Sequence, residues 1–373
     1  MAKKYLGLVI IISGIIFSVL IIIRSMIKTN QSTPIGNLTE ARFYQSLDGQ
    51  TVQCQLCPNN CLLKNGQRGL CGVRENINGK LYSLSYGKVA AFNIDPIEKK
   101  PFYHFLPGSG VYSIGTPGCN LDCKNCQNWD IAHRKPEEIN TKEMTPEEVV
   151  SEAIANQTGI IAFTYNEPTV FYEYMYDIAK LAKERDLKTV VVSNGYINTE
   201  PLKELLPFIS AFKVDLKAFD EKTYLELNRG KLEPVLNTIK TVKESGVWLE
   251  IVNLVVPGYT DKPEEVQKMC RWIKENVGPD VPVHLSKFWP NYQLTNLPPT
   301  PEKTLIEVRE LCLKEGLNYV YTGNIDYLEG NTTFCPKNKE PLIERDGYLI
   351  SKNVLEKDGS SKECPIKIPG VWQ

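Results

Sequence analysis

A regular alternation of strand-like and helix-like segments constrains this chain more than any other feature. Seven short apolar runs are predicted strands, at 111–116, 159–164, 189–193, 211–216, 248–256, 281–288 and 319–322. Helical patterns lie between most of them, at 146–156, 170–185, 200–207, 231–245, 263–276 and 301–315. Because each gap can hold a crossover helix, the strands are expected to run parallel. The fold class is therefore predicted to be α/β, as a full or partial TIM-like barrel.

Smaller segments are expected on both sides of this barrel. In the segment before the barrel, short runs of alternating residues from Lys80 to Phe92 predict a hairpin. The expected division of the chain is a membrane anchor (1–28), a tether (29–50), a cysteine-rich segment with the hairpin (51–110), the barrel (111–326) and a strand-poor tail with degenerate cysteine pairs (327–373).

One apolar run has the length of a membrane span. The 19 residues from Tyr5 to Ile23 carry no charge, which is enough to cross a bilayer. A cleaved signal peptide and a buried core helix are the alternatives. Two basic residues flank each end, so the charges do not set an orientation. We expect an uncleaved transmembrane helix and a membrane location, with the catalytic body in the cytoplasm.

The composition narrows the class of function. The 43 basic and 44 acidic residues leave a net charge of −1, so no basic excess exists to attract nucleic acid. Eleven cysteines against three histidines favour thiolate ligation over a histidine-rich metal site. The cysteines are clustered and odd in number, which favours metal or iron–sulfur ligation in a reducing compartment over a disulfide scaffold.

The strongest signal is a group of three cysteines just after the first barrel strand. Cys119, Cys123 and Cys126 have the spacing C-x3-C-x2-C. Three thiolates on one loop can hold three corners of an iron–sulfur cube. The fourth iron then lacks a protein ligand, and an open metal position is where a cofactor or substrate binds. A zinc knuckle is the alternative interpretation of this spacing.

Polar residues at the ends of the later strands are the candidate binding groups, because barrel active sites collect at the carboxyl ends of strands. Asp215 and Lys217 alternate along one strand and so face the same side of the sheet. His104 and His133 are expected at the surface or in loops. The candidates for cofactor or substrate binding are Asn166, Glu167, Ser193, Asn194, Asp215, Lys217, Asn253 and His284.

A second cysteine group precedes the barrel. Cys54, Cys57, Cys61 and Cys71 have the spacing C-x2-C-x3-C-x9-C. Four thiolates so close together fit a closed zinc site, and they fit a second, fully ligated iron–sulfur cluster almost as well. Unligated or disulfide-bonded thiols remain a third interpretation. Two further cysteines in helical patterns are expected to be buried and structural, namely Cys270 and Cys312.

The three-cysteine motif resembles the radical SAM superfamily. That resemblance implies a 4Fe–4S cluster whose open iron chelates the amino and carboxylate groups of S-adenosylmethionine. Reduction of the sulfonium would give methionine and a 5′-deoxyadenosyl radical. Glu167 would then lie where related enzymes bind the methionine amino group. Lys217 would meet the methionine carboxylate, with Asp215 as its partner.

Further motifs look like one branch, the AmmeMemoRadiSam-system radical SAM enzymes, which are related to pyruvate formate-lyase activating enzyme. They are Asp95-Pro-Ile-Glu-Lys-Lys-Pro101, His104-Phe105, Pro107-Gly108, Cys126-Gln-Asn-Trp129, Thr164-Tyr-Asn-Glu-Pro168, Ser193-Asn-Gly195, Val214-Asp-Leu-Lys217, Val256-Pro-Gly258 and Leu297-Pro-Pro-Thr-Pro301. The resemblance implies hydrogen abstraction from an unidentified protein or small-molecule substrate. It also implies a low-potential electron donor such as ferredoxin or flavodoxin, and Memo-type and AMMECR1-like partner proteins. A glycyl-radical enzyme activase and a non-enzymatic iron–sulfur or zinc protein are the alternatives.

The sequence departs from the family pattern at two places. Asn125 stands just before the third motif cysteine, where relatives carry an aromatic residue near the adenine. Relatives also often carry two C-x2-C pairs in the tail, whereas here Cys335 and Cys364 keep only the first cysteine of each pair. We therefore expect weaker contact with the adenine and no metal in the tail.

Overall fold

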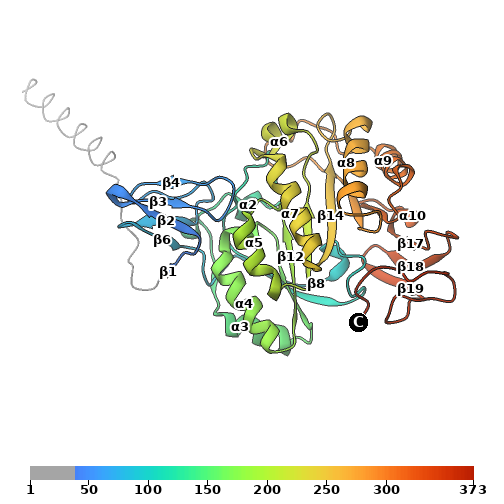
Figure 1. The fold of residues 1–373 in the computed structure, drawn as a ribbon, viewed down its shortest axis with the longest axis horizontal. Coiled ribbons are helices and arrows are strands. Elements are labelled where there is room, and N and C mark those ends of the chain that lie inside the picture. The colour runs from blue at the N-terminus through green and yellow to red at the C-terminus, as the bar shows by residue number, and fades with distance from the viewer. Residues whose placement is uncertain (1–37) are drawn as a thin grey trace, which may run out of the picture. The chain divides into compact units, whose positions relative to one another are not determined.

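An eight-stranded sheet forms the centre of the protein (Figure 1). The computed structural model describes residues 38–373. In spatial order the sheet is β16 (Val320–Gly323), β15 (Val283–Lys287), β14 (Trp248–Val255), β13 (Ala211–Asp215), β12 (Lys188–Ser193), β11 (Ile160–Phe163), β9 (Gly110–Gly115) and β8 (Ala91–Pro96). The seven strands from β9 to β16 are parallel, and β8 pairs antiparallel with β9.

The sheet is open, because β8 and β16 are its two edges and do not pair with each other. The predicted parallel α/β arrangement is thus confirmed, in its partial-barrel form. Each of the seven predicted strands overlaps an observed one. The parallel strands are buried on both faces, with side chains such as Val190, Ile251 and Val283 fully inaccessible to water, whereas the edge strand β8 is largely exposed. Such near-continuous apolar strands are typical of parallel sheets covered by helices.

The covering helices are α3 (Pro146–Ala155), α4 (Tyr172–Glu184), α5 (Thr199–Leu205), α6 (Glu221–Asn228), α7 (Leu232–Ser245), α8 (Pro263–Asn276) and α9 (Glu302–Glu315). Short helices α2 (Trp129–Ala132) and α10 (Leu328–Asn331) lie in connections. The Thr145 hydroxyl caps α3 by accepting from the Glu148 backbone N–H at 3.2 Å. Gly246 ends α7 in a left-handed conformation (φ 80°). Helix α6 was not predicted.

Small antiparallel sheets precede the barrel. One contains β1 (Thr39–Glu40), β6 (Lys80–Ser83) and β5 (Arg74–Ile77), and another contains β2 (Tyr44–Leu47), β3 (Thr51–Cys54) and β4 (Leu62–Leu63). Strand β7 (Lys88–Val89) pairs with β10 (Lys142–Glu143). The strands between Lys80 and Phe92 do not pair with each other, so the predicted hairpin is wrong. Strand β6 turns back onto β5, while β7 and β8 join two other sheets.

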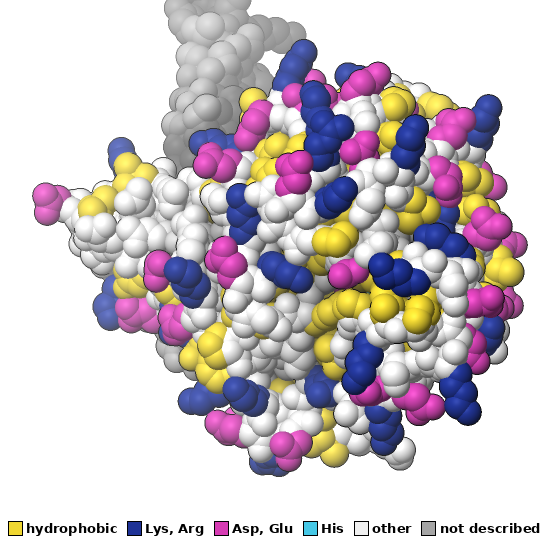
Figure 2. All heavy atoms as spheres, turned by 45° about the vertical axis from the view of Figure 1, so that its right-hand side comes forward, with side chains coloured by type: hydrophobic (Ala, Val, Ile, Leu, Met, Phe, Trp, Pro, Cys, Tyr) yellow, Lys and Arg dark blue, Asp and Glu magenta, His cyan; other side chains and the backbone are white. Residues whose placement is uncertain are grey.

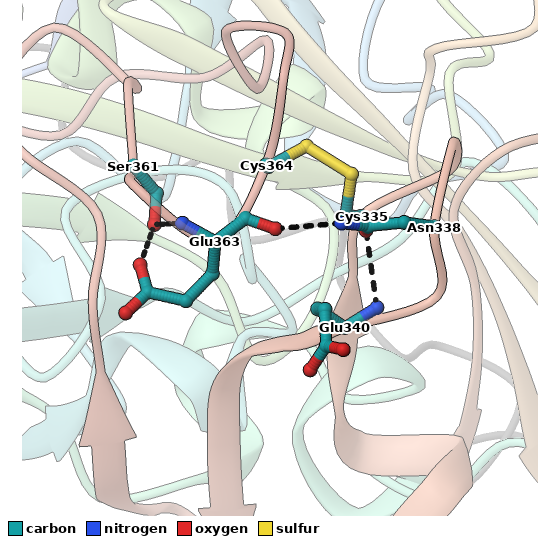
Figure 3. Close-up of a disulfide and its surroundings, with 6 residues drawn as sticks. All are labelled: Cys335, Asn338, Glu340, Ser361, Glu363 and Cys364. Carbon is teal, nitrogen blue, oxygen red and sulfur yellow. Dashed lines mark hydrogen bonds between the residues drawn. A yellow bond between two sulfur atoms is a disulfide. The ribbon is translucent and has the colours of Figure 1, made fainter.

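The tail contains more structure than predicted. Strands β17 (Thr333–Phe334), β18 (Pro341–Asp346) and β19 (Leu349–Asn353) form an antiparallel sheet, so the expectation of a strand-poor tail is wrong. A disulfide joins Cys335 to Cys364, and the Asn338 amide donates to the Glu363 carbonyl beside it at 2.8 Å (Figure 3). A second disulfide joins Cys270 of α8 to Cys312 of α9. Both of these helical cysteines are buried as expected, but they are bonded to each other.

The predicted transmembrane helix and membrane location require correction. Within residues 38–373, no helix combines the length and the apolar character that crossing a bilayer demands. The apolar run from Tyr5 to Ile23, on which the prediction was placed, lies outside the described residues. The membrane assignment therefore has no support in the structure.

Candidate active site

A cavity of about 1000 Å³ opens where the parallel strands end. The loop after β9 contributes all three cysteines of the motif to its wall, and the β18–β19 turn at Asp346–Tyr348 closes part of the opposite side. Nine of the sequence-predicted site residues line this cavity: Cys119, Cys123, Cys126, Asn166, Glu167, Asn194, Asp215, Lys217 and His284. Residues up to about 170 positions apart in the chain thus meet at one site, as the parallel-sheet prediction required.

The three cysteines, here called the triad, form no disulfide. Burial is the main cause that raises the pKa of each thiol, to about 11 for Cys126. Amide groups donate toward two of the sulfurs: Asn228 Nδ2 lies 3.2 Å from Cys123 Sγ, and Asn194 Nδ2 lies 3.9 Å from Cys119 Sγ. A bound metal displaces the proton of such a thiol, because the thiolate is the ligand. The triad is therefore suited to metal ligation.

A glycine allows the triad loop to pass close to the N-terminal segment. Gly118 has φ 101°, and a Cβ there would lie 2.7 Å from Val73 Cγ1 and 2.8 Å from the Cys71 carbonyl oxygen. A larger residue would strain the backbone and push the loop away from the N-terminal segment.

Across residues 38–373, no three or more Cys, His, Asp and Glu side chains gather around a point where one metal ion could sit. Asn125 and Asn166 line the same cavity as the triad, and the amide oxygen of each is buried without a hydrogen-bond partner in the described structure. They offer acceptors to a ligand that carries N–H groups.

Glu167 is buried and its carboxylate is already satisfied. Oε1 accepts from the Thr169 N–H at 3.0 Å and from the hydroxyls of Thr169 and Ser193, both at 2.7 Å. Oε2 accepts from the Asn194 N–H at 2.8 Å. Burial raises the pKa of Glu167, and these four donors act against that rise. The carboxylate can attract an ammonium group by its charge, but its lone pairs are largely occupied.

Asp215 lies between two lysines of the same strand region. Its carboxylate accepts from Lys213 Nζ and, at 3.2 Å, from Lys217 Nζ. Burial acts against the charged form of Asp215, but the two lysines outweigh it and lower the pKa of the carboxyl. Asp215 also holds the pKa of Lys217 above its ordinary value despite burial, with the nearby Cys123 as a further cause. The predicted Asp215–Lys217 pair is present and lies at the triad.

Comparison with known proteins decides the family. A model described as the radical SAM superfamily matches residues 113–273. A protein of Methanocaldococcus jannaschii, named only as uncharacterized, is 44% identical over 329 residues, which covers 88% of this chain and 97% of that protein. The pyruvate formate-lyase-activating enzyme of Clostridium pasteurianum is 27% identical over 179 residues, which covers 45% of this chain and 72% of that enzyme. The chain belongs to the radical SAM superfamily.

Membership in the radical SAM superfamily implies S-adenosylmethionine and a 4Fe–4S cluster as cofactors. Among solved structures, a radical SAM methyltransferase from Sphaerobacter thermophilus aligns with a TM-score of 0.49 and 15% identity, over 80% of each chain. The family match itself spans β9 through α8, the part of the sheet that carries the triad and Lys217.

Two predicted residues of this radical SAM protein lie off the cavity. Asn253 points to the other face of β14, where its Nδ2 donates to the Leu216 carbonyl at 2.7 Å, while its neighbours Val252 and Leu254 face the cavity. The strict alternation of side chains along a strand explains the difference. Ser193 is absent from the lining and instead holds Glu167.

A buried histidine–glutamate network closes the far side of the cavity. His284 Nε2 lies 2.6 Å from Glu250 Oε2, and Glu250 also accepts from the backbone N–H of His104 at 2.9 Å. His104 lies in a loop, one of its two expected positions, but it is fully buried, with Nε2 2.6 Å from the Tyr321 hydroxyl. Burial lowers the pKa of His104 to about 4, which keeps its ring neutral.

Sequence reasoning missed four residues at the site: Asp95, Lys100, Tyr165 and Lys213. Tyr165 lines the cavity with φ 73°, an uncommon conformation for a tyrosine, and donates from its hydroxyl to Asp95 Oδ2 at 2.8 Å. Lys213 is two positions before Asp215 on β13, so the same alternation that grouped Asp215 with Lys217 would have included it.

The four N-terminal cysteines, here called the tetrad, lie outside the cavity lining. Burial, and to a smaller extent the neighbouring tetrad thiols, raise the pKa of Cys57 and Cys71. Two of the sulfurs flank Gly69, where a Cβ would lie 3.6 Å from Cys71 Sγ and 3.7 Å from Cys61 Sγ. None of them forms a disulfide. Among the described residues, the tetrad is not found as a group placed around a single ion. The metal at the tetrad stays a prediction.

Proposed function

We propose that the protein cleaves S-adenosylmethionine at the triad and uses the resulting radical to abstract hydrogen from an unidentified protein or small-molecule substrate. The observation that carries this proposal is the position of Cys119, Cys123 and Cys126 on one wall of a cavity large enough for a cofactor and a substrate together. When bound, a reduced 4Fe–4S cluster supplies the electron that breaks the sulfonium carbon–sulfur bond.

The triad would hold three corners of the cluster and leave one iron facing the cavity. The amide of Asn228, 3.2 Å from Cys123 Sγ, would stabilise the thiolate form of that ligand by donating to it. Because Cys123 is buried, the surrounding apolar wall also keeps water from that side of the site.

Three residues would position the methionine part of S-adenosylmethionine. Asn166 Oδ1 is the unpartnered acceptor at the end of β11, so it would accept from the methionine ammonium group, with the nearby charge of Glu167 adding attraction. Lys217 is held charged by Asp215 and would donate to the methionine carboxylate. Asn125 Oδ1 would accept from an N–H group of the adenine in place of the aromatic contact that relatives make.

Iron analysis and electron paramagnetic resonance of anaerobically purified protein test the proposal. The wild type should bind about four irons that a Cys119→Ala, Cys123→Ala, Cys126→Ala triple variant loses. The spectrum of the reduced protein should change when S-adenosylmethionine is added, because the cofactor binds the open iron. A spectrum indifferent to S-adenosylmethionine, or a triple variant that binds as much iron as the wild type, would contradict the proposal.

A glycyl-radical enzyme activase is the second candidate, and the similarity to the Clostridium pasteurianum activating enzyme favours it. In that case the substrate hydrogen would come from a protein glycine. Transfer of deuterium from an α-deuterated glycine of a partner protein into 5′-deoxyadenosine would support this candidate. Either candidate needs a low-potential electron donor such as ferredoxin or flavodoxin. Memo-type and AMMECR1-like partner proteins belong to the first candidate and would be sought by co-purification.

A further inference from the structure

Two buried lysines face the cavity and have no place in the proposed cofactor contacts. Lys100 is 5% exposed and Lys213 is 4% exposed, and both line the cavity. Lysines are rarely buried to this degree unless they are fully paired. Their pairing therefore determines whether they serve the fold or a ligand.

Each buried lysine shares its carboxylate with a second lysine. Lys100 Nζ lies 2.5 Å from Asp95 Oδ2, while Lys99 Nζ lies 2.9 Å from Asp95 Oδ1. In the same way, Lys213 and Lys217 both contact Asp215. Two carboxylates are thus divided among four ammonium groups, which leaves two positive charges in excess over these pairs.

Other carboxylates also line the cavity, namely Glu98, Glu167, Glu302, Asp326 and Asp346, and the charge of Glu167 acts to raise the pKa of Lys213. The buried acids nearest the two lysines have further hydrogen-bond partners. The Glu167 carboxylate accepts four hydrogen bonds, from Thr169, Ser193 and Asn194. Glu250 is held by His284 and by backbone N–H groups. Glu98, also buried, accepts from the Gly108 N–H at 2.8 Å and lies 4.0 Å from Arg345. The outer surface differs, because Figure 2 shows basic and acidic side chains interspersed across the visible face.

The two buried lysines line the same cavity, and burial acts against the charge of both. Burial is the main cause that lowers the pKa of Lys100, and Lys213 is a further cause. Burial likewise lowers the pKa of Lys213, against the attraction of Asp215. Like charges held together away from water raise the free energy of the empty cavity, and a bound anion would relieve that cost.

We propose that Lys100 and Lys213 form a subsite for an anionic group of the substrate, a carboxylate or a phosphate. This inference rests on the proposed function, because it names the class of molecule that would donate the hydrogen. The subsite adjoins the cofactor contacts, because Lys213 shares Asp215 with Lys217, the lysine beside Cys123. Lys100 reaches the cavity from the segment after β8. An anion held between Lys100 and Lys213 would place the rest of the substrate toward the triad.

The fold does not need these two lysines for charge balance. Without Lys213, Asp215 keeps Lys217, and without Lys100, Asp95 keeps Lys99 and the Tyr165 hydroxyl. The neutral variants Lys100→Met and Lys213→Met should therefore fold and be at least as stable as the wild type to heat. A purely structural role predicts the opposite, a clear loss of stability.

Isothermal titration of the full-length protein with inorganic phosphate, and separately with succinate, tests the subsite. Saturable binding of either probe to the wild type is expected, and the probe that binds distinguishes the two anion classes. Lys100→Met and Lys213→Met should each weaken that binding by about tenfold or more. The matched control is Lys99→Met, which removes an exposed lysine from the same Asp95 and should leave the affinity within about twofold.

Three results would overturn the subsite: no saturable binding of either probe, binding that is unchanged in both buried-lysine variants, or failure of both variants to fold. Anion binding in this experiment requires neither iron nor a reductant. Its failure would therefore leave the proposed cleavage of S-adenosylmethionine standing, whereas a reduced wild type that ignores S-adenosylmethionine would refute that reaction irrespective of anion binding.

Discussion

The triad and the tetrad contain the same kind of ligand but lie in different surroundings. The triad lies on the wall of the cavity, next to unpartnered amide oxygens and a charged lysine. The tetrad lies in the small N-terminal sheets and lines no part of that cavity. We therefore propose that the triad carries the chemistry and that the tetrad has a structural role.

The largest expected effect is on the triad itself. Changing Cys123 to Ala should lower the rate of S-adenosylmethionine cleavage by about a thousandfold or more, because a cluster held at two corners is labile. The measurement is the rate of 5′-deoxyadenosine formation after anaerobic reduction. Cys270→Ala is the control, because that cysteine is buried between helices and should leave the rate within a few-fold of wild type.

The next prediction concerns a buried ion pair through which the segment that contains the tetrad should stabilise the fold. Arg74 Nη1 lies 2.9 Å from Glu173 Oε1, and both side chains are almost completely buried. Glu173→Gln would leave the arginine charge buried without a counterion, at a cost of about 3–5 kcal/mol in the free energy of unfolding. Urea denaturation measures it. The control Glu204→Gln removes the surface partner of Arg42 and should cost about 0–1 kcal/mol.

Metal analysis of the tetrad gives a smaller effect. If Cys54, Cys57, Cys61 and Cys71 hold a metal, Cys71→Ala should release it and lower the midpoint of thermal unfolding by several degrees, roughly 1–2 kcal/mol for a chain of this size. Zinc and iron are counted separately before and after the change. If Cys71→Ala also removed the iron that the triad holds, the two cysteine groups would not be independent, and the contrast between triad and tetrad would be wrong.

The smallest effect concerns Asn125. This residue lines the cavity with its amide oxygen unpartnered in the described structure, where relatives carry an aromatic side chain. Asn125→Tyr should tighten the binding of S-adenosylmethionine by about 0.5–1.5 kcal/mol, the usual gain from an aromatic contact. Equilibrium dialysis with labelled cofactor measures the affinity. A weaker affinity would indicate that the amide oxygen already binds the cofactor more strongly than a ring does.

The barrel could be predicted from the sequence because its signals are local. Apolar strands and amphipathic helices alternate, so every predicted strand and helix overlaps an observed one. The expectation that active sites form at the carboxyl ends of strands identified nine residues that line one cavity. It could not show that Asn253 points to the opposite face of the sheet. Strand boundaries fix which face a side chain occupies, and a shift of one residue reverses it.

Features that depend on distant partners could not be predicted. The tail sheet is held by the buried Arg345, whose Nη2 donates to the Tyr103 carbonyl at 2.8 Å, more than 200 residues away in the chain. Strand β8 joins the barrel edge only through its pairing with β9. Glu250 sits near the start of its strand rather than at the carboxyl end, so no sequence rule marked it as a partner of His284.

A side-by-side measurement of 5′-deoxyadenosine tests the central claim most directly. The wild type, the triple alanine variant of the triad and the quadruple alanine variant of the tetrad are purified anaerobically, reduced and given S-adenosylmethionine. We predict product from the wild type and from whatever tetrad variant remains folded, at similar rates per bound triad cluster, and none from the triad variant. Product from the triad variant, or its absence in a folded tetrad variant, would contradict the assignment of the chemistry to the triad alone.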